Sequence, residues 1–211
     1  MNQSLSESES IKDKLASSLP LLLALLVMTI ILLRGIGNSA LGYADADRIL
    51  MDGVFGINMW SSRLALLAFM YIGVTFWFLL IRRIYDNLTA FAATLLLITT
   101  PFIAKWGWYT MAELPVLSMA MISGYVFYRY TESDRPVYLY WTALLFGLAC
   151  WTKQTAVFLF IWFLLYVIST GNLTAYLKRR EVWIAVFIAL VLLVPLGVVT
   201  LWLGEQNITP V

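Results

Sequence analysis

The stretch VYLYWTALLFGLACWTKQTAVFLFIWFLLYVI, residues 137–168, decides how often this chain reverses direction. Two apolar runs meet in it at Trp151-Thr152-Lys153-Gln154. A single helix over this stretch would be about 48 Å long, against a bilayer core of about 30 Å, and would carry Lys153 near its centre. A cation at that depth is costly. We therefore predict two short helices separated by a break at Lys153.

The composition is that of an integral membrane protein. Of the 211 residues, 62% are hydrophobic and 12% are charged, whereas soluble domains carry about 25% charged residues; the mean hydropathy is +0.84. A net charge of +2, without a Lys/Arg-rich run, argues against a nucleic-acid partner. With no histidine and one cysteine, Cys150, the chain lacks the means for a histidine-based triad, the usual zinc sites or an intrachain disulfide. Metals with oxygen ligands remain open.

Apolar runs of a length that suits membrane helices recur along the whole chain. They fall at residues 17–34, 62–81, 88–106, 114–130, 137–152, 155–169 and 182–203. We therefore predict an all-α, polytopic membrane protein with about seven transmembrane helices. Residues 1–16 would form a disordered cytoplasmic tail, 17–203 the transmembrane module and 204–211 the start of an outer loop.

The Lys and Arg residues predict the orientation, because cytoplasmic loops carry an excess of them. Seven spans with a cytoplasmic N-terminus put nine of the fourteen cations inside: Lys12, Lys14, Arg82, Arg83, Arg129, Arg135, Lys178, Arg179 and Arg180. The outer set is Arg34, Arg48, Arg63, Lys105 and Lys153. Merging the fifth and sixth spans would reverse this bias. We expect a multi-pass protein of the plasma (inner) membrane.

An acidic segment, ALGYADADRILMDGVF at residues 40–55, follows the first apolar run. On a helix, Asp45, Arg48 and Asp52 share one face and apolar side chains share the opposite face, which is typical of an amphipathic helix on the membrane surface. In an extended segment, Asp45 and Asp47 would share a face instead. From the residues alone, a solvated interfacial helix with paired charges explains the pattern as well as a functional site does.

Three further ionisable residues, Lys105, Glu113 and Lys153, fall on the same predicted non-cytoplasmic side. Glu113 has a structural explanation, because an acid just before Pro115 suits the start of a helix. Lys153 lies between two apolar runs, where a cation either snorkels to the interface or meets an anion. We favour a phosphate as that anion.

Three motifs in this order resemble the C-superfamily (GT-C) of glycosyltransferases, including its protein O-mannosyltransferase-like and aminoarabinose-transferase-like families. They are Asp45-Ala46-Asp47-Arg48 running into ILMDGVF, then TTPFIAKWGWYTMAELP at residues 99–115, and GLACWTKQT at residues 147–155. Many relatives have Asp-Glu where this chain has Asp45-Ala46-Asp47, so the position of the catalytic carboxylate is ambiguous. Family members usually run to twice this length or more. We therefore expect an N-terminal transmembrane module, as in a fragment.

The resemblance implies transfer of a sugar from a polyprenyl-phosphate-linked donor to a hydroxyl of a lipid, glycan or protein acceptor. The reaction would take place on the non-cytoplasmic side and invert the anomeric centre. It implies Asp45 as the base, with Asp47 as the second choice. The implied substrate-binding residues are Arg48, Lys105, Glu113 and Lys153. No metal ligand is assigned, although a divalent cation, Mg²⁺ or Mn²⁺, is one way to bridge the phosphate and an acid in this loop.

Two other classes of protein stay open, a transporter component and a non-catalytic membrane scaffold. Transporters place ionisable residues at mid-membrane depth and often contain internal repeats. This chain shows no repeat, and the candidate site residues all fall on one predicted side of the membrane: Asp45, Asp47, Arg48, Lys105, Glu113 and Lys153. The pattern therefore favours the glycosyltransferase.

Overall fold

The computed structural model describes residues 16–32, 59–106, 113–171 and 173–208, and every regular element within these ranges is a helix. The predicted all-α class is thereby confirmed. The predicted amphipathic helix around Asp45 and Asp52 lies outside the described residues. The chain divides into two compact units, Met1–Met111 and Ala112–Val211, which we describe one at a time.

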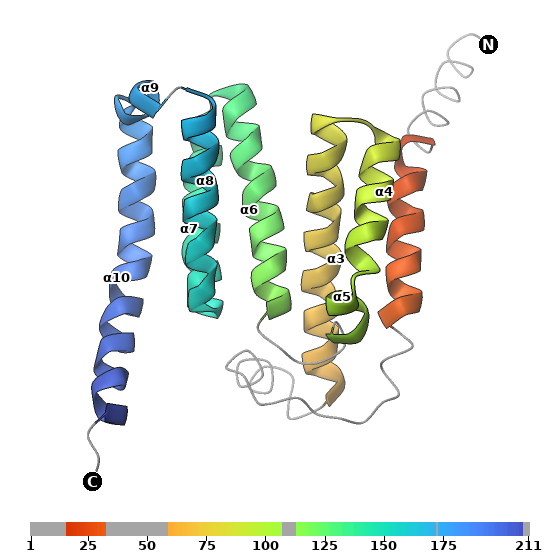
Figure 1. The fold of residues 1–211 in the computed structure, drawn as a ribbon, viewed down its shortest axis with the longest axis horizontal. Helices are drawn as coiled ribbons and strands as arrows, with labels where there is room; N and C mark the ends of the chain where they lie inside the picture. Colours follow the sequence, from red (N-terminus) through yellow and green to blue (C-terminus); the bar gives the residue numbers. More distant parts are fainter. Residues whose placement is uncertain (1–15, 33–58, 107–112, 172, 209–211) are drawn as a thin grey trace, which may run out of the picture. The chain divides into compact units, whose positions relative to one another are not determined.

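The first unit contains the helix Ala16–Leu32 followed by α3 (Met59–Ile84), α4 (Asn87–Ile98) and α5 (Pro101–Trp106) (Figure 1). The first helix runs antiparallel to α3, because contacts near its start reach the end of α3 and contacts near its end reach the middle of α3. Arg82 Nη1 donates to the carbonyl of Ser17 at 3.4 Å, and the hydroxyls of Thr29 and Tyr71 share a hydrogen bond.

A sharp reversal joins α3 to α4. Asp86 has an extended backbone and caps α4, since its carboxylate accepts a 2.7 Å hydrogen bond from the backbone N–H of Thr89. Hydrogen bonding from the Thr89 side chain, together with that from its backbone N–H, holds the pKa of the Asp86 carboxyl below its usual value. Such a cap satisfies one of the amides that the first turn of a helix leaves unpaired, so a turn of two residues is enough to start α4.

The third predicted run, 88–106, is wrong as a single helix, because α4 ends at Ile98 and α5 begins at Pro101. Proline lacks a backbone N–H and suits only the first turn of a helix, and it disfavours helical geometry in the residue before it. The hydroxyls of Thr99 and Thr100 bond back to the carbonyls of Leu95 and Leu97 at 2.7 and 2.8 Å. The same two carbonyls also accept the backbone N–H groups of Thr99 and Thr100, so the backbone and the side chains of the two threonines together close the end of α4.

The second unit contains α6 (Glu113–Ser133), α7 (Pro136–Thr152), the 3₁₀ turn η1 (Gln154–Val157), α8 (Phe158–Ser169), α9 (Leu173–Leu177) and α10 (Arg180–Ile208). Asp134, with φ of 53°, forms the tight turn between α6 and α7, and Pro136 occupies the first turn of α7. Lys153 has an extended backbone, with φ −155° and ψ 127°, and ends α7. The predicted break at Lys153 is confirmed.

Helix α8 folds back along α7 after this break. Phe146 on α7 and Phe160 on α8 lie on opposite sides of Lys153 in sequence, and their ring centroids are 6.4 Å apart. Phe163, one turn further along α8, packs against Phe127 of α6, and their ring centroids are 4.7 Å apart. These contacts join a buried cluster around Ala149 and Cys150. The two halves of residues 137–168 are thus an antiparallel pair.

Helix α10 lies against α7 at very short range. A Cβ added to Gly147 would clash with Cδ1 of Leu192 and would lie 2.9 Å from its Cβ, so only glycine fits at this contact. One turn later, Trp151 Nε1 donates a 2.8 Å hydrogen bond to the carbonyl of Leu192. Pro195 lies inside α10 just beyond this point.

Each of the seven predicted apolar runs coincides with helical structure. Two of the described helices are long and apolar enough to cross a bilayer, Leu64–Ile84 and Arg180–Trp202. Shorter apolar helices occupy Ala16–Leu32, Asn87–Ile98, Pro136–Thr152 and Gln154–Ser169. The helical segments are therefore confirmed, and seven membrane crossings stay a prediction.

Candidate functional site

Lys153 and Glu113 lie at one end of the hairpin that α6 and α7 form. Glu113 is the first residue of α6 and Lys153 directly follows α7. An acid near the N-terminus of a helix and a cation near a C-terminus both interact favourably with the helix dipole. Because α6 and α7 are antiparallel, these two positions meet, and Lys153 Nζ donates a hydrogen bond to Glu113 Oε1 within an ion pair.

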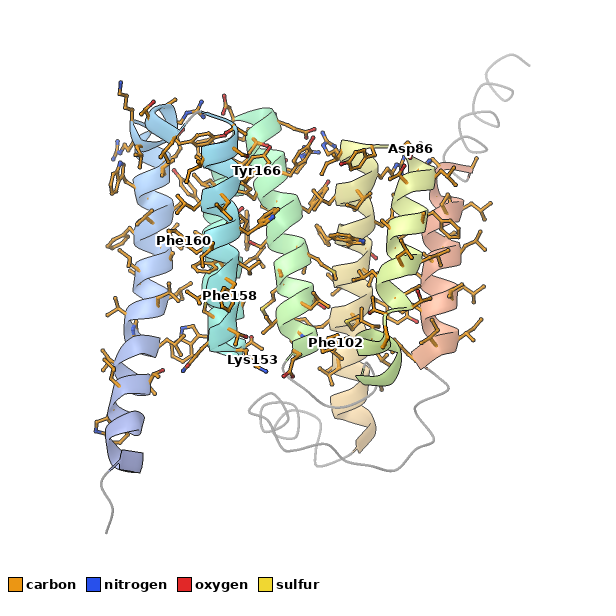
Figure 2. The ribbon with its side chains drawn as sticks, in the orientation of Figure 1. Asp86, Phe102, Lys153, Phe158, Phe160 and Tyr166 are labelled. Atoms are coloured by element: carbon orange, nitrogen blue, oxygen red, sulfur yellow. The ribbon has the colours of Figure 1, made fainter. Side chains whose placement is uncertain are left out.

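The pair is neither sealed in the interior nor fully solvated. The Lys153 and Glu113 side chains are 37% and 35% exposed, and Figure 2 shows Lys153 at the end of the helices, where α7 meets η1. The hydrogen bond from Lys153 holds the pKa of the Glu113 carboxyl below its usual value, against the opposing effect of burial. Glu113 is thus a carboxylate at neutral pH, and the pair is ionic.

The ammonium of Lys153 retains capacity for another acceptor. A lysine carries three N–H donors, and Glu113 is the carboxylate that it contacts. A phosphate oxygen that approached the exposed side of Nζ would gain a charge-assisted hydrogen bond without displacing Glu113. The geometry can therefore hold an anion at this end of the second unit.

Polar residues beside Lys153 hold the break in place. Gln154 Nε2 donates to Thr200 Oγ1 of α10 at 2.7 Å, and Thr152 Oγ1 contacts Met119 Sδ of α6 at 3.7 Å. The hydrogen bond from Trp151 to Leu192 adds a third link. Sequence reasoning did not identify Thr200, and no signal could have found it, because it lies deep within the seventh apolar run.

Among the predicted site residues whose side chains the structure describes, Glu113 and Lys153 are brought together as a pair. The structural explanation of Glu113 as an acid that starts a helix agrees with its place in α6. Lys153 meets a carboxylate, which is one of the two outcomes expected for it. Asp45, Asp47 and Arg48 lie outside the described residues. Lys105 belongs to α5 in the first unit, and its side chain is not among those that the structure describes.

A second cluster lies at the opposite end of this unit, around Arg179. Its Nη1 donates to Asp134 Oδ1 at 2.5 Å and to the Tyr130 hydroxyl at 3.4 Å, and its guanidinium lies 5.3 Å from the ring centroid of Tyr176. Asp134 raises the pKa of Arg179, and Arg179 lowers that of Asp134. These contacts tie the α6–α7 turn to the start of α10, so Arg179 has a structural role.

No group of three or more Cys, Asp or Glu side chains that could hold a metal ion occurs among the described residues. That statement does not extend to the acidic segment around Asp45 and Asp47, which lies outside them.

The fold and the site define a helical membrane protein with an ionic pair at a helix break. The sequence profile of the dolichyl-phosphate-mannose-protein mannosyltransferase family matches residues 49–199, and the chain belongs to this family. Neither the comparison with curated proteins nor that with solved structures found a match. Family membership confirms the GT-C resemblance and places the chain among membrane glycosyltransferases.

Proposed function

We propose that this chain transfers a sugar from a polyprenyl-phosphate-linked donor to an acceptor hydroxyl on the non-cytoplasmic side of the membrane, with inversion. The acceptor oxygen attacks the anomeric carbon while the bond from that carbon to the phosphate oxygen breaks. The phosphate leaves with the electron pair, and a carboxylate takes the acceptor's proton. Asp45 is the proposed base, with Asp47 as the alternative.

One observation carries this proposal beyond family membership. Lys153 is partly exposed at a helix end, where a lipid-linked phosphate at the membrane surface can reach it. The departing phosphate gains negative charge as the bond breaks, and a fixed cation lowers the energy of that state more than that of the bound donor. Arg48 and Lys105 are further proposed phosphate ligands.

Glu113 has a positioning role in this proposal. It accepts a hydrogen bond from Lys153 Nζ, which restricts an otherwise flexible side chain. A carboxylate so close to the phosphate also repels it, so the site works only if Lys153 stays between the two anions. This arrangement explains why Glu113 belongs to the predicted substrate-binding set although it contributes no positive charge.

Transfer from a radiolabelled polyprenyl-phosphate sugar tests the proposal. Lys153→Met keeps most of the aliphatic bulk and removes the ammonium. Hydrogen bonds to charged groups are worth about 1.5–3 kcal/mol, so kcat/KM for the donor should fall about tenfold to a hundredfold. Lys153→Arg should recover only part of this loss, because a planar guanidinium does not reproduce a compact ammonium.

Lys178→Met is the matched control, since Lys178 is an exposed lysine at the opposite end of the same unit. Its transfer rate should equal that of the wild type at equal folded amounts. Unchanged donor dependence in Lys153→Met would reduce Lys153 to an interfacial anchor. Absence of transfer from every lipid-linked donor in the wild type would favour the alternative, a non-catalytic membrane scaffold or transporter component.

A further inference from the structure

The second unit contains an apolar cavity of about 240 Å³ at the end that carries α9. It lies between α6, α7, α8, α9 and α10, and its lining includes Phe146, Phe160, Phe163, Leu177, Ala185 and Ala189. Several lining side chains remain open to the outside, for example Phe160, which is 52% exposed, and Leu177, which is 48% exposed. The cavity is thus a recess with an entrance on the surface of the helices.

The cavity offers almost nothing to a polar ligand. Among its lining residues, only Thr142, Tyr130 and Tyr176 carry a polar side-chain atom. The hydroxyl of Thr142 donates to the carbonyl of Tyr138 at 2.9 Å, and the hydroxyl of Tyr130 accepts from Arg179. Apolar cavities of about 150 Å³ stay dry and take up apolar molecules. This larger recess therefore suits a hydrocarbon group.

Two cations are close in sequence to residues that line the cavity. Lys178 follows directly after the lining residue Leu177, and Arg180 lies two positions before the lining residue Val182. Both side chains are exposed. Arg179, between them, is engaged with Asp134, and it also lies 4.0 Å from Glu181. Within the described part of the chain, Lys178 and Arg180 make no ion pair of their own, so their charges are available to an external anion.

We propose that this recess binds one acyl chain of an anionic diacyl phospholipid, whose phosphate is held by Lys178 and Arg180. A hydrocarbon tail and an anionic head at one end of it match the apolar recess and the exposed cations that adjoin its lining residues in α9 and α10. Clusters of basic residues next to membrane helices attract anionic lipids in this way. The site lies at the opposite end of the unit from Lys153, and the proposal does not depend on the proposed sugar transfer.

A polypeptide fits this recess less well. A single turn of helix with its side chains, about 10–12 Å in diameter and about 5.4 Å long, occupies roughly 400–600 Å³, more than the cavity of about 240 Å³. A non-helical segment would bring backbone N–H and C=O groups that need partners, and the lining has few to offer. An acyl chain brings no such groups, and each methylene that it buries is stabilising.

Native mass spectrometry of the full chain in detergent measures the binding. The probes are phosphatidylglycerol and phosphatidylcholine with identical acyl chains, and undecaprenyl phosphate. We expect one phosphatidylglycerol to bind at least tenfold more tightly than phosphatidylcholine. Equal affinity for the two phospholipids would overturn the proposal. Binding of undecaprenyl phosphate that is tighter than that of phosphatidylglycerol and is lost in Ala189→Phe would also overturn it, because the recess would then hold the polyprenyl chain.

Two sets of variants locate the site. Ala189→Phe fills the recess and should weaken phosphatidylglycerol binding at least tenfold, whereas Leu190→Phe, on the exposed face of the same helix, should leave it unchanged. Lys178→Gln and Arg180→Gln should each weaken it about fivefold, in line with the attraction that one basic residue contributes near an anionic lipid surface. Arg83→Gln removes the same charge from the other unit and should have no effect. Equal losses in Ala189→Phe and Leu190→Phe would refute the assigned site.

Discussion

Lys153 and Glu113 are 40 residues apart in sequence, yet their side chains form an ion pair at one end of the α6–α7 hairpin. Each charge lies at the helix end that favours it. The pair also gives the lysine at the helix break a partner within the protein, so Lys153 need not reach into the interface for an anion. A cation that is held by one carboxylate and still partly exposed is available to a phosphate.

The stability of the pair should depend on pH in one direction. The pKa of Glu113 is depressed in the folded chain. The contribution of its carboxylate to the stability of the folded chain is therefore complete above the ordinary glutamate pKa of about 4.3. It is lost as the pH falls through the lower pKa that Glu113 has in the folded chain. Wild type and Glu113→Gln should therefore differ in Tm at pH 7 and converge in acid. The difference should correspond to less than about 1 kcal/mol, because solvent screens a pair that is this exposed.

Thermal unfolding in detergent between pH 3 and 7 measures this difference. The comparison needs the variant, because Asp86 and Asp134 also have lowered pKa values and contribute in the same direction. A difference in Tm that stays constant down to pH 3 would show that Glu113 acts through packing rather than through its charge.

The acidic segment should contain the base. Asp45→Asn keeps the shape of the side chain but removes its ability to take the acceptor's proton, so transfer should be abolished while the amount of protein in the membrane stays constant. Turnover near the wild-type rate would move the role to Asp47. If Asp45→Asn and Asp47→Asn both retained full activity in the radiolabelled transfer assay, the catalytic role of this segment would be excluded.

The contact between Gly147 and Leu192 should tolerate no added atom. Gly147→Ala places a methyl group within 2.9 Å of Leu192 Cβ, and overpacking of this kind costs about 1–3 kcal/mol. We expect a lower Tm for Gly147→Ala in detergent. Gly197→Ala is the matched control on α10, because a Cβ there would meet no atom within 4 Å. An equal effect of the two substitutions would contradict the close approach of α7 and α10.

The predicted membrane orientation can be tested by cysteine labelling. The native Cys150 is buried and should not react. Cysteines at Arg83 and Lys178 should react with an impermeant thiol reagent only after permeabilisation, whereas a cysteine at Gly42 should react in intact cells. Labelling of the Lys178 position in intact cells would contradict the orientation and show that α7 and α8 do not form two crossings.

The sequence allowed most of the helices to be predicted, and the exceptions have local causes. The break at Lys153 followed from the cost of a mid-membrane charge. The break before Pro101 was missed although Thr99-Thr100-Pro101 carries its signal, because the flanking apolar residues suggested one continuous run. Helix α9 was also missed, since Leu173–Leu177 is too short to show a periodicity.

The sequence by itself determined most of the segments that are helical and that they belong in a membrane. Apolar side chains and the need to satisfy backbone hydrogen bonds internally leave such segments little choice but a helix. Only the tertiary structure decided that Lys153 pairs with Glu113, that Arg179 is engaged with Asp134, and that Gly147 admits Leu192. These relationships depend on which helix faces come together and on how far the helices are shifted along their axes relative to one another. Side-chain packing between distant segments sets both, and no local pattern encodes them.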